Sequence, residues 1–250
     1  MIVENIYTKE FTLSDLHTDC FGRLKPAVML WLIQEVSGTH ASHLGASWDA
    51  LAQKNLFWAV IRHKVEIFRL PEVGQTVTLR TWPMPTTRVA YPRATEARDA
   101  EGNLLFRSHA IWVLMDSNTR AMVLPGKSGV DVPGTLLGCE AAAPGSIHGR
   151  TLENYVNRTV GYAVLDKNGH MNNTRWLDWT SNLLSSQFHR DHTLKQLDIC
   201  YLAEATEGQQ LSLFWQLDGE NQLQVEALTA DGSARRILAL NAQYEDFVRV

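Results

Sequence analysis

The stretch Asp166-Lys167-Asn168-Gly169-His170-Met171-Asn172-Asn173 places an acid, an imidazole and three amides in one short polar turn. Apolar residues at helical spacing follow at once, namely Trp176, Trp179, Leu183 and Leu184 at i, i+3, i+7 and i+8. The pattern therefore predicts a polar loop that enters a buried helix. A helix N-terminus offers unpaired N–H groups and positive potential, so this is a suitable place to hold a carbonyl oxygen that becomes an oxyanion.

A weaker copy of this stretch occurs earlier in the chain. Asp19–Pro26 aligns with Asp166–Asn173 at an offset of 166 − 19 = 147 residues and keeps the aspartate and the glycine, but not the histidine or the asparagines. Two further landmarks recur in the same order: Leu70–Gln75 with Glu204–Gln209, at an offset of 208 − 74 = 134, and Asp99–Gly102 with Ala230–Gly232. We therefore predict two tandem copies of one unit, with chemistry retained in the second copy only. The change in offset places about 13 extra residues in the first copy, after its helix.

Hydrophobic periodicity predicts the same order of elements in both copies. In each copy a strand precedes the polar turn, a long apolar helix follows it, and further strands come after. The helices are expected from Ala27 to about Gly45 and from the second turn to about His189. The expected strands are Tyr7–Leu13, Phe57–Ile61, Gln75–Trp82, Ala90–Arg98, Phe106–Met115, Tyr155–Val164, Lys195–Ala203, Leu211–Leu217, Gln222–Leu228 and Arg236–Phe247.

One long helix against a curved antiparallel sheet is the arrangement called a hotdog. The predicted fold is therefore α+β, with two tandem hotdog units, a double hotdog. A segment rich in glycine and proline, residues 126–150, is interpreted as the linker. The predicted domains are then 1–125, an N-terminal unit with a degenerate loop, and 151–250, a C-terminal unit with the complete polar turn.

Composition argues against several classes of protein. A net charge of −4 does not fit a general nucleic-acid binder. The longest strictly apolar run, Ala27–Ile33, is far shorter than the roughly 20 residues of a membrane-spanning helix, and Met1–Asn5 does not resemble the start of a signal peptide. The three cysteines form no Cys-x-x-Cys pair. We expect a cytoplasmic protein without stable membrane association.

His170 and Glu204 are the candidate acid–base residues. An imidazole changes charge near neutral pH, which suits a general acid or base. A carboxylate in the apolar surroundings expected for Glu204 is unfavourable unless it is paired. The structural alternatives are a histidine that caps a helix and a solvated glutamate at a strand end. The acid and the asparagines around His170 favour the functional interpretation.

These motifs resemble those of the acyl-acyl carrier protein thioesterases, the enzymes that end fatty-acid synthesis, and the chain looks like a bacterial relative of the plant members. The family pattern Asp-x-Asn-x-His-hydrophobic-Asn-Asn reads here as Asp166–Asn173, and aromatic residues follow it. A later Tyr, with a Glu three residues on, corresponds to Tyr201 and Glu204. Matching stretches in the first half are Trp58–Arg62, Thr81-Trp82 and Met115–Arg120.

One position departs from the family pattern. Many plant members carry a cysteine directly after the glutamate, where this chain has Ala205. Cys200 does not match the family position. The resemblance therefore implies a reaction without a thiol nucleophile, in which Glu204 acts either as a base or by direct attack that gives an anhydride.

The resemblance implies hydrolysis of a fatty acyl-carrier thioester, which releases free fatty acid and ends chain elongation. We assign activation of the attacking water to Glu204 and His170, with His170 as proton donor to the leaving thiolate. Asn168 is expected to hold the substrate carbonyl or orient the water. Asp166 is expected to brace the loop by fixing the histidine tautomer.

Further groups are expected to complete the oxyanion site and support the loop. They are the backbone N–H groups near Gly169 and His170, together with Asn172 and Asn173. The first unit is expected to supply an acyl tunnel. The candidate lining residues are Val28, Met29, Trp31, Leu32 and Trp58.

The expected partner is an acidic acyl carrier protein that bears a fatty acyl chain and docks on a basic patch. The candidate patches are Arg88, Arg93 and Arg98, or Arg62 with Lys64. Formation of a homodimer is left open.

No cofactor and no metal are expected. His40 and His43, like His189 and His192, have a spacing that can bind zinc, but no further ligand completes either set. Three alternatives stay open at this point: an acyl-coenzyme A thioesterase of the same fold, a hydroxyacyl dehydratase or hydratase, and a non-catalytic lipid-binding module.

Overall fold

The same succession of elements occurs twice in the computed structural model, which describes residues 5–247. Two compact units result, Met1–Pro144 and Gly145–Val250. Residues 1–4 and 248–250, which the predicted domains and the N-terminal signal analysis include, lie outside the described residues. The division of the sequence at residues 125 and 151 stays a prediction.

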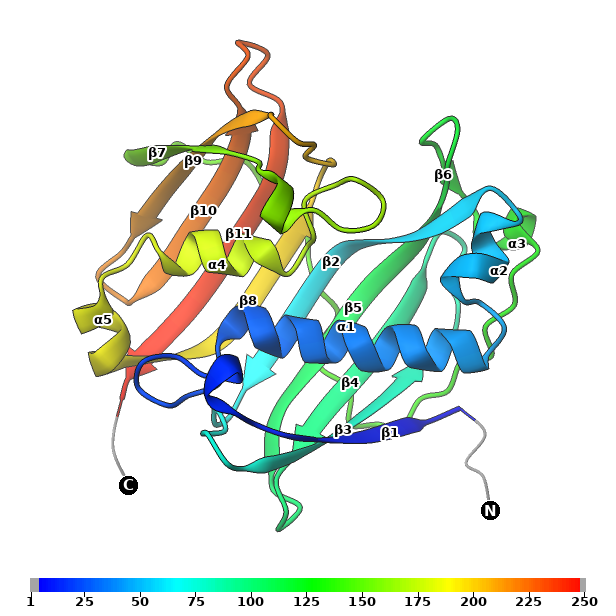
Figure 1. Ribbon diagram of the computed structural model, residues 1–250, viewed down its shortest axis with the longest axis horizontal. Coiled ribbons are helices and arrows are strands. Elements are labelled where there is room, and N and C mark those ends of the chain that lie inside the picture. Colours follow the sequence, from blue (N-terminus) through cyan, green and yellow to red (C-terminus); the bar gives the residue numbers. More distant parts are fainter. Residues whose placement is uncertain (1–4, 248–250) are drawn as a thin grey trace. The chain divides into compact units, whose positions relative to one another are not determined.

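The first unit is an antiparallel sheet with one long helix (Figure 1). Within this unit the strands lie in the order β1-β3-β4-β5-β2, and β6 pairs with β5. The strands are β1 (Tyr7–Thr12), β2 (Leu56–Ile67), β3 (Thr76–Pro83), β4 (Tyr91–Arg98), β5 (Leu104–Asp116) and β6 (Met122–Val123). The helices are α1 (Pro26–His43), α2 (Trp48–Ala52) and α3 (Pro125–Ser128).

The second unit repeats this topology. Its strands lie in the order β7-β9-β10-β11-β8, which matches the first unit strand for strand. Its elements are β7 (Asn154–Thr159), α4 (Arg175–Ser181), α5 (Ser186–Asp191), β8 (His192–Tyr201), β9 (Gln210–Leu217), β10 (Gln222–Thr229) and β11 (Arg236–Asp246). Helix α1 spans 18 residues whereas α4 spans 7, so part of the extra length of the first copy lies in its long helix. The predicted α+β fold with two tandem units is confirmed.

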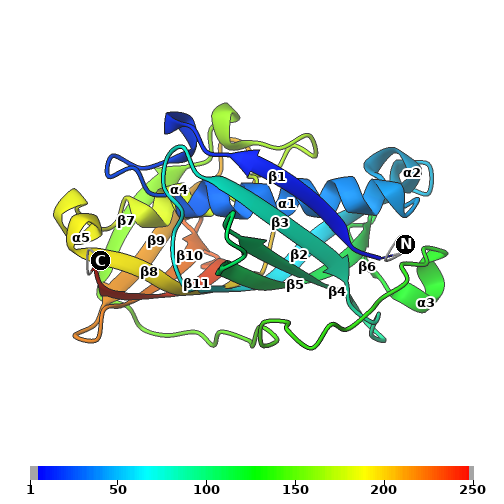
Figure 2. The same ribbon diagram turned by 90° about the horizontal axis from the view of Figure 1, so that it is seen from below.

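Helix α1 covers one face of the first sheet (Figures 1 and 2). Pro26 occupies its first turn, where a missing N–H is tolerated. Arg93 of β4 contacts His40 of α1, with 3.1 Å between Nη1 and Nδ1, so Arg93 marks the sheet face that α1 covers. Trp31 lies on the solvent side of the helix with 45% of its surface exposed. Although its first turns are apolar on every side, helix α1 is therefore exposed to solvent on one side.

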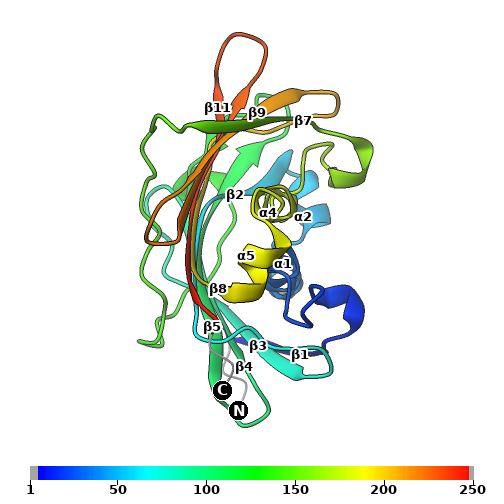
Figure 3. The ribbon, with the colours of Figure 1, turned by 90° about the vertical axis from the view of Figure 1, so that its left-hand side faces the viewer.

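The single long helix predicted for the second unit was wrong. Helix α4 ends at Ser181, and α5 begins a few residues later (Figure 3). The physical reason is a new N-cap, because Oγ of Ser185 accepts the backbone N–H of Phe188 at 3.1 Å. Both helices lie on the same side of the sheet formed by β8–β11.

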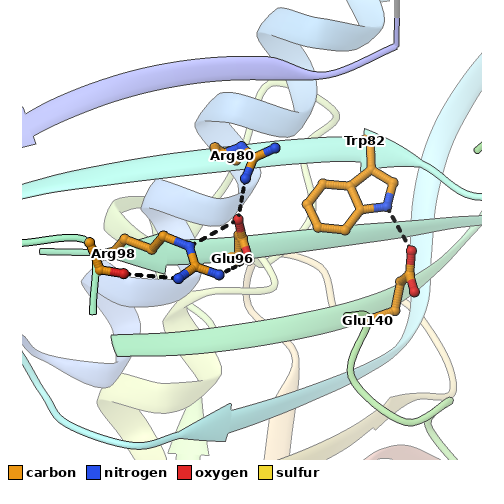
Figure 4. Close-up of polar contacts among 6 residues, drawn as sticks. Arg80, Trp82, Glu96, Arg98 and Glu140 are labelled. Atoms are coloured by element: carbon orange, nitrogen blue, oxygen red, sulfur yellow. Dashed lines mark hydrogen bonds and ion pairs between the residues drawn. The ribbon is translucent and has the colours of Figure 1, made fainter. Parts of the chain in front are cut away.

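The chain after α3 runs along the face of the first sheet opposite α1 (Figure 2), and we call residues 130–144 the strap. The strap binds this face through Glu140, which accepts Trp82 Nε1–H at 3.2 Å (Figure 4). On the same face the buried Glu96 pairs with Arg80 and Arg98 at 2.8 and 3.0 Å. Much of the predicted linker is thus held against the first unit.

Gly134 is the tightest point of the strap. A Cβ atom at this position would overlap the backbone carbonyl of Met84 and the nitrogen of Pro85. We therefore expect Gly134→Ala to lower the free energy of unfolding by about 1–3 kcal/mol, as overpacking does. Gly145→Ala is the matched control, because no atom lies within 4 Å of its Cβ position. Urea denaturation of both variants checks this, and equal midpoints would contradict it.

Candidate functional site

The loop before α4 is shaped by an aspartate and a glycine. Asp166 Oδ1 accepts the backbone N–H groups of Asn168 and His170 at 2.8 and 3.3 Å. The backbone N–H of Asp166 donates to the carbonyl of His170 at 2.8 Å. Gly169 has φ +76°, in the left-handed region that favours glycine. These two residues close the turn and present the imidazole of His170 on its outer side.

Backbone hydrogen bonds fasten this loop to the segment after β8. The N–H of Met171 donates to the carbonyl of Ala205 at 2.8 Å, and His170 forms a β-bridge with Thr206. The hydroxyl of Tyr201 donates to the carbonyl of Asn173 at 3.2 Å. Burial raises the pKa of Tyr201, so this hydroxyl stays protonated and keeps donating.

These backbone hydrogen bonds bring His170 and Glu204 together. Nε2 of His170 lies 3.3 Å from Oε2 of Glu204, although the two residues are far apart in the sequence. The His170 side chain is 12% exposed and that of Glu204 is 38% exposed. The expectation of apolar surroundings for Glu204 was therefore wrong, because solvent reaches the carboxylate. An imidazole beside a hydrated carboxylate can take a proton from water and return it to a leaving group.

Two expectations about the loop need correction. The carboxylate of Asp166 accepts backbone N–H groups and not a ring N–H of His170, so it positions the residue rather than its tautomer. The N–H of Gly169 donates to the carbonyl of Asp166 at 3.0 Å, and that of His170 is also engaged. These two N–H groups therefore support the loop and are not free to bind an oxyanion.

Asn172 supports the start of α4. Its Oδ1 accepts both the N–H and the hydroxyl of Thr174, at 2.9 and 2.8 Å. Its own N–H donates to the carbonyl of Val164 at 2.8 Å. We did not predict the role of Thr174 from the sequence, although Asn-x-Thr before an apolar helix is the pattern of a side chain that closes an Asx turn.

The first unit carries the same loop, bond for bond. Asp19 Oδ1 accepts the N–H groups of Phe21 and Arg23 at 2.9 and 3.0 Å, as Asp166 does in the second unit. The N–H of Leu24 donates to the carbonyl of Pro71 at 2.8 Å, in the place of the bond from Met171 to Ala205. The predicted repeat therefore extends to the backbone of this loop.

The side chains of the first loop cannot perform acid–base chemistry. Arg23 stands where the second unit has His170, and its guanidinium pairs with Asp19 at 3.3 Å. Leu70 stands where the second unit has Glu204. The backbone scaffold is thus duplicated, and the histidine–carboxylate pair occurs in the second copy.

The expected lining residues of the first unit separate into two groups. Met29 and Leu32 are fully buried, and Val28 and Trp58 are partly buried, so these four remain candidates for an apolar lining. Trp58 also donates from Nε1 to the carbonyl of Ala46 at 3.0 Å. Trp31 faces solvent and stacks on a histidine ring, which is a correction. It cannot line an enclosed tunnel.

The two positions considered for a thiol are both buried and unsuited to attack. Ala205 is enclosed beneath the loop and has no reactive group. Cys200 is buried on β8, and its Sγ–H donates to the carbonyl of Gly145 at 3.5 Å. Neither position therefore offers an accessible thiol.

Arg93 and Arg98, from the first candidate set, do not lie on one surface. Arg93 is buried against α1, whereas Arg98 lies on the opposite face of the sheet, paired with Glu96. Alternation along β4 separates them, since residues an odd number apart point to opposite faces. Of the two sets named from the sequence, Arg62 with Lys64 remains.

Two observations concern groups that could have indicated other functions. Among residues 5–247, no three histidine, cysteine or acidic side chains are arranged to hold a metal ion. In the same range, no helix is both long and apolar enough to cross a membrane.

Removing the brace of the loop should weaken both folding and activity. We expect Asp166→Ala to lower the free energy of unfolding by about 1–3 kcal/mol, because two partly buried N–H donors lose their acceptor. The turnover of the site should fall at least about 10-fold, because His170 loses its position. Asp19→Ala is the control: it removes the same backbone bonds from the first loop and also the ion pair with Arg23, so it should destabilise at least as much and leave turnover unchanged. Thermal denaturation and kinetics on both variants check this.

Family models cover most of the chain. Residues 4–124 match the model described as the acyl-ACP thioesterase N-terminal domain, and residues 150–245 match the C-terminal domain. A chloroplastic oleoyl-acyl carrier protein thioesterase of Coriandrum sativum is 25% identical over 195 residues, which cover 69% of this chain and 52% of the relative. A chloroplastic dodecanoyl-[acyl-carrier-protein] hydrolase of Umbellularia californica is 24% identical over 191 residues, 70% of this chain and 50% of the relative. The chain spans about half the length of these curated relatives.

Solved structures agree over nearly the whole chain. A crystal structure of an acyl-ACP thioesterase from Bacteroides thetaiotaomicron superposes with a TM-score of 0.87 and 25% identity, covering 96% of this chain and 98% of that one. The 12:0-ACP thioesterase of Umbellularia californica superposes with a TM-score of 0.83 at 19% identity, over 97% and 98%, which supports the fold.

Proposed function

The chain belongs to the acyl-ACP thioesterase family, and from this premise we propose that it hydrolyses the thioester of a fatty acyl-acyl carrier protein. The product is a free fatty acid, whose release ends chain elongation. The observation that carries the proposal is the pair of His170 and Glu204, 3.3 Å apart, in the one loop copy that keeps its acid–base side chains. The resemblance seen in the sequence is confirmed at the level of the family.

The proposed reaction uses water as the nucleophile. Glu204, with His170, takes a proton from water, and the resulting hydroxide oxygen bonds to the thioester carbon. The carbonyl oxygen becomes an oxyanion, to which the side-chain amide of Asn168 donates a hydrogen bond. The oxyanion then re-forms the carbonyl, the carbon–sulfur bond breaks, and His170 protonates the departing thiolate. Asp166 positions the loop, with Gly169, Asn172 and Asn173 supporting its shape.

The acyl chain and the carrier protein of the substrate are assigned to different surfaces of the protein. The first unit is assigned the acyl chain, with the fully buried Met29 and Leu32 as lining residues. An acidic carrier protein approaches a basic surface that includes Arg62 and Lys64. A cytoplasmic location fits the three cysteines, all of which are free thiols.

The decisive experiment measures products from purified protein. Acyl carrier protein loaded with saturated chains of several lengths should yield free thiol and free fatty acid in equal amounts, followed by a thiol reagent and by mass spectrometry. The same chains on coenzyme A should react more slowly. Faster reaction on coenzyme A would reassign the partner, and an enoyl product without thiol release would identify a dehydratase. No fatty acid from any chain length would overturn the proposal.

A further inference from the structure

The sheet face that α1 covers in the first unit carries a row of polar side chains. His63 of β2 lies opposite Ala110 of β5, and Ala110 lies opposite Arg93 of β4. Arg93 contacts α1, so the side chains of this row point towards the helix. Ser108 and Trp112 lie two residues either side of Ala110 on β5 and therefore share its face. They are the diagonal neighbours of His63, close enough for long side chains to contact one group.

Three polar atoms of this row are buried without a hydrogen-bond partner among residues 5–247: His63 Nε2, Ser108 Oγ and Trp112 Nε1. His63 and Ser108 are 4% and 1% exposed. Burial, with His109 nearby, lowers the pKa of His63 to about 3, so its ring is neutral at physiological pH. Buried polar atoms in native proteins are almost always hydrogen-bonded. The polypeptide therefore does not provide the hydrogen-bond partner that these three atoms need.

Other buried hydroxyls near this row are hydrogen-bonded, although Gln34 Oε1 and His109 Nε2, further buried atoms of the first unit, also lack a partner among residues 5–247. The hydroxyl of Thr95 donates to that of Thr81 at 3.0 Å, and Thr81 donates to the carbonyl of Ala94 at 2.9 Å. On α1, the hydroxyl of Ser37 donates to the carbonyl of Ile33 at 2.7 Å. Buried hydroxyls in this unit therefore find partners except beside His63.

The charge at this site favours an oxygen atom as the missing partner. Arg93 is 7% exposed and contacts only neutral groups, Nδ1 of His40 and Oγ1 of Thr81, at 3.1 and 3.3 Å. Burial lowers the pKa of Arg93 to about 10, which still leaves it charged at neutral pH. No carboxylate forms an ion pair with it among the described residues. An indole N–H, a hydroxyl and a guanidinium are donors, so they complement an acceptor.

We propose that His63, Ser108 and Trp112 form a subsite for an oxygen function on the acyl chain, a hydroxyl or a keto group along its length. The inference rests on the proposed function, because it places the acyl chain in the first unit. It narrows the substrate class from plain fatty acyl chains to oxygenated ones. A plain acyl chain leaves the three polar atoms without hydrogen-bond partners, whereas an oxygenated chain offers them an oxygen atom. A site with buried polar groups of this kind discriminates strongly between the two substrates.

Direct binding tests the subsite without relying on hydrolysis. Isothermal titration compares free fatty acids of equal length that are plain, hydroxylated at successive carbons, or carry a keto group at those carbons. We expect at least one oxygenated acid to bind about 10-fold more tightly than the plain acid. The hydroxyl and keto series show which of the two oxygen functions is bound.

Three variants remove one polar atom each: Ser108→Ala, His63→Leu and Trp112→Phe. Each should reduce the preference for the oxygenated acid to within about 2–3-fold, since the loss of any one polar atom leaves the bound oxygen incompletely hydrogen-bonded. Ser37→Ala is the matched control, because its hydroxyl is already satisfied within α1 and the preference should persist. Circular dichroism identifies any variant that fails to fold, and the remaining variants then decide.

The preference should also appear in kinetics. On carrier-bound chains, the ratio of kcat/KM for the oxygenated over the plain chain should be about 10 in the native protein and should fall in the same variants. Equal affinity for plain and oxygenated acids, or a preference that survives all the folded variants, would overturn the subsite and show that internal water satisfies these atoms. Binding without hydrolysis of any carrier thioester would leave the subsite standing and overturn the proposed function instead.

Discussion

Replacing Glu204 by glutamine should lower kcat on acyl-carrier thioesters by about 10³-fold, within the range for loss of a general base. The amide keeps the size of the side chain but cannot accept a proton from water, and it removes the negative charge beside His170. The fold should persist, because 38% of the Glu204 side chain is exposed. Stopped-flow or steady-state thiol release measures the loss, and the thermal midpoint should change little.

Glu207→Gln is the matched control for this experiment. Glu207 is an exposed carboxylate three residues further along the same turn, so its removal changes the local charge by the same amount. We expect its kcat to stay within about 2-fold of the native value, as surface charges contribute little. Similar losses in the two variants would show that charge near the loop, and not proton transfer by Glu204, supports the reaction.

The same carboxylate could act by direct attack, and isotopic labelling separates the two routes. In a single turnover in H₂¹⁸O, a base leaves Glu204 unlabelled and places ¹⁸O in the fatty acid. Attack by the carboxylate forms an anhydride, whose hydrolysis at the glutamyl carbon leaves ¹⁸O in Glu204. Peptide mass spectrometry distinguishes these outcomes. Exposure of the carboxylate to water leads us to expect the unlabelled result.

Replacing His170 by alanine should lower kcat/KM by about 10²–10⁴-fold, the usual contribution of a positioned acid or base. The loss should depend on the leaving group if His170 protonates the thiolate. An aryl thiol is a weaker base than an alkyl thiol and departs without a proton, so thioesters of aryl thiols should lose at least about 10-fold less. An equal loss on aryl and alkyl thioesters would contradict the donor role and assign His170 to activation of water.

The sequence was sufficient for the repeat, the order of elements along the chain and the polar loop, because these depend on local patterns. Asp166 and Gly169 recur as Asp19 and Gly22, and both glycines have positive φ. The pairing of His170 with Glu204 required the family resemblance, since no local pattern relates positions so far apart. In the structure, the backbone hydrogen bond from Met171 to Ala205 holds the two segments together and so brings His170 near Glu204.

Other features could not be obtained from periodicity. The break between α4 and α5 depends on Ser185, which reads equally well as a residue within a helix. Strand β2 continues past the predicted end at Ile61 to Ile67, because charged residues there alternate outward. Trp31 looked like a lining residue because it is apolar, yet helical geometry turns it to solvent. In each case the structure depends on a tertiary contact or on the direction of a side chain, which the composition of the segment does not specify.

The first loop keeps its shape with Arg23 in place of a histidine and Leu70 in place of a glutamate. The backbone shape of this loop is therefore compatible with different side chains at the two positions that react in the second copy. A duplicated gene with such a scaffold can lose chemistry in one half by a few substitutions. By the same logic, grafting an imidazole and a carboxylate onto Arg23 and Leu70 is a feasible starting point for engineering a second reactive centre.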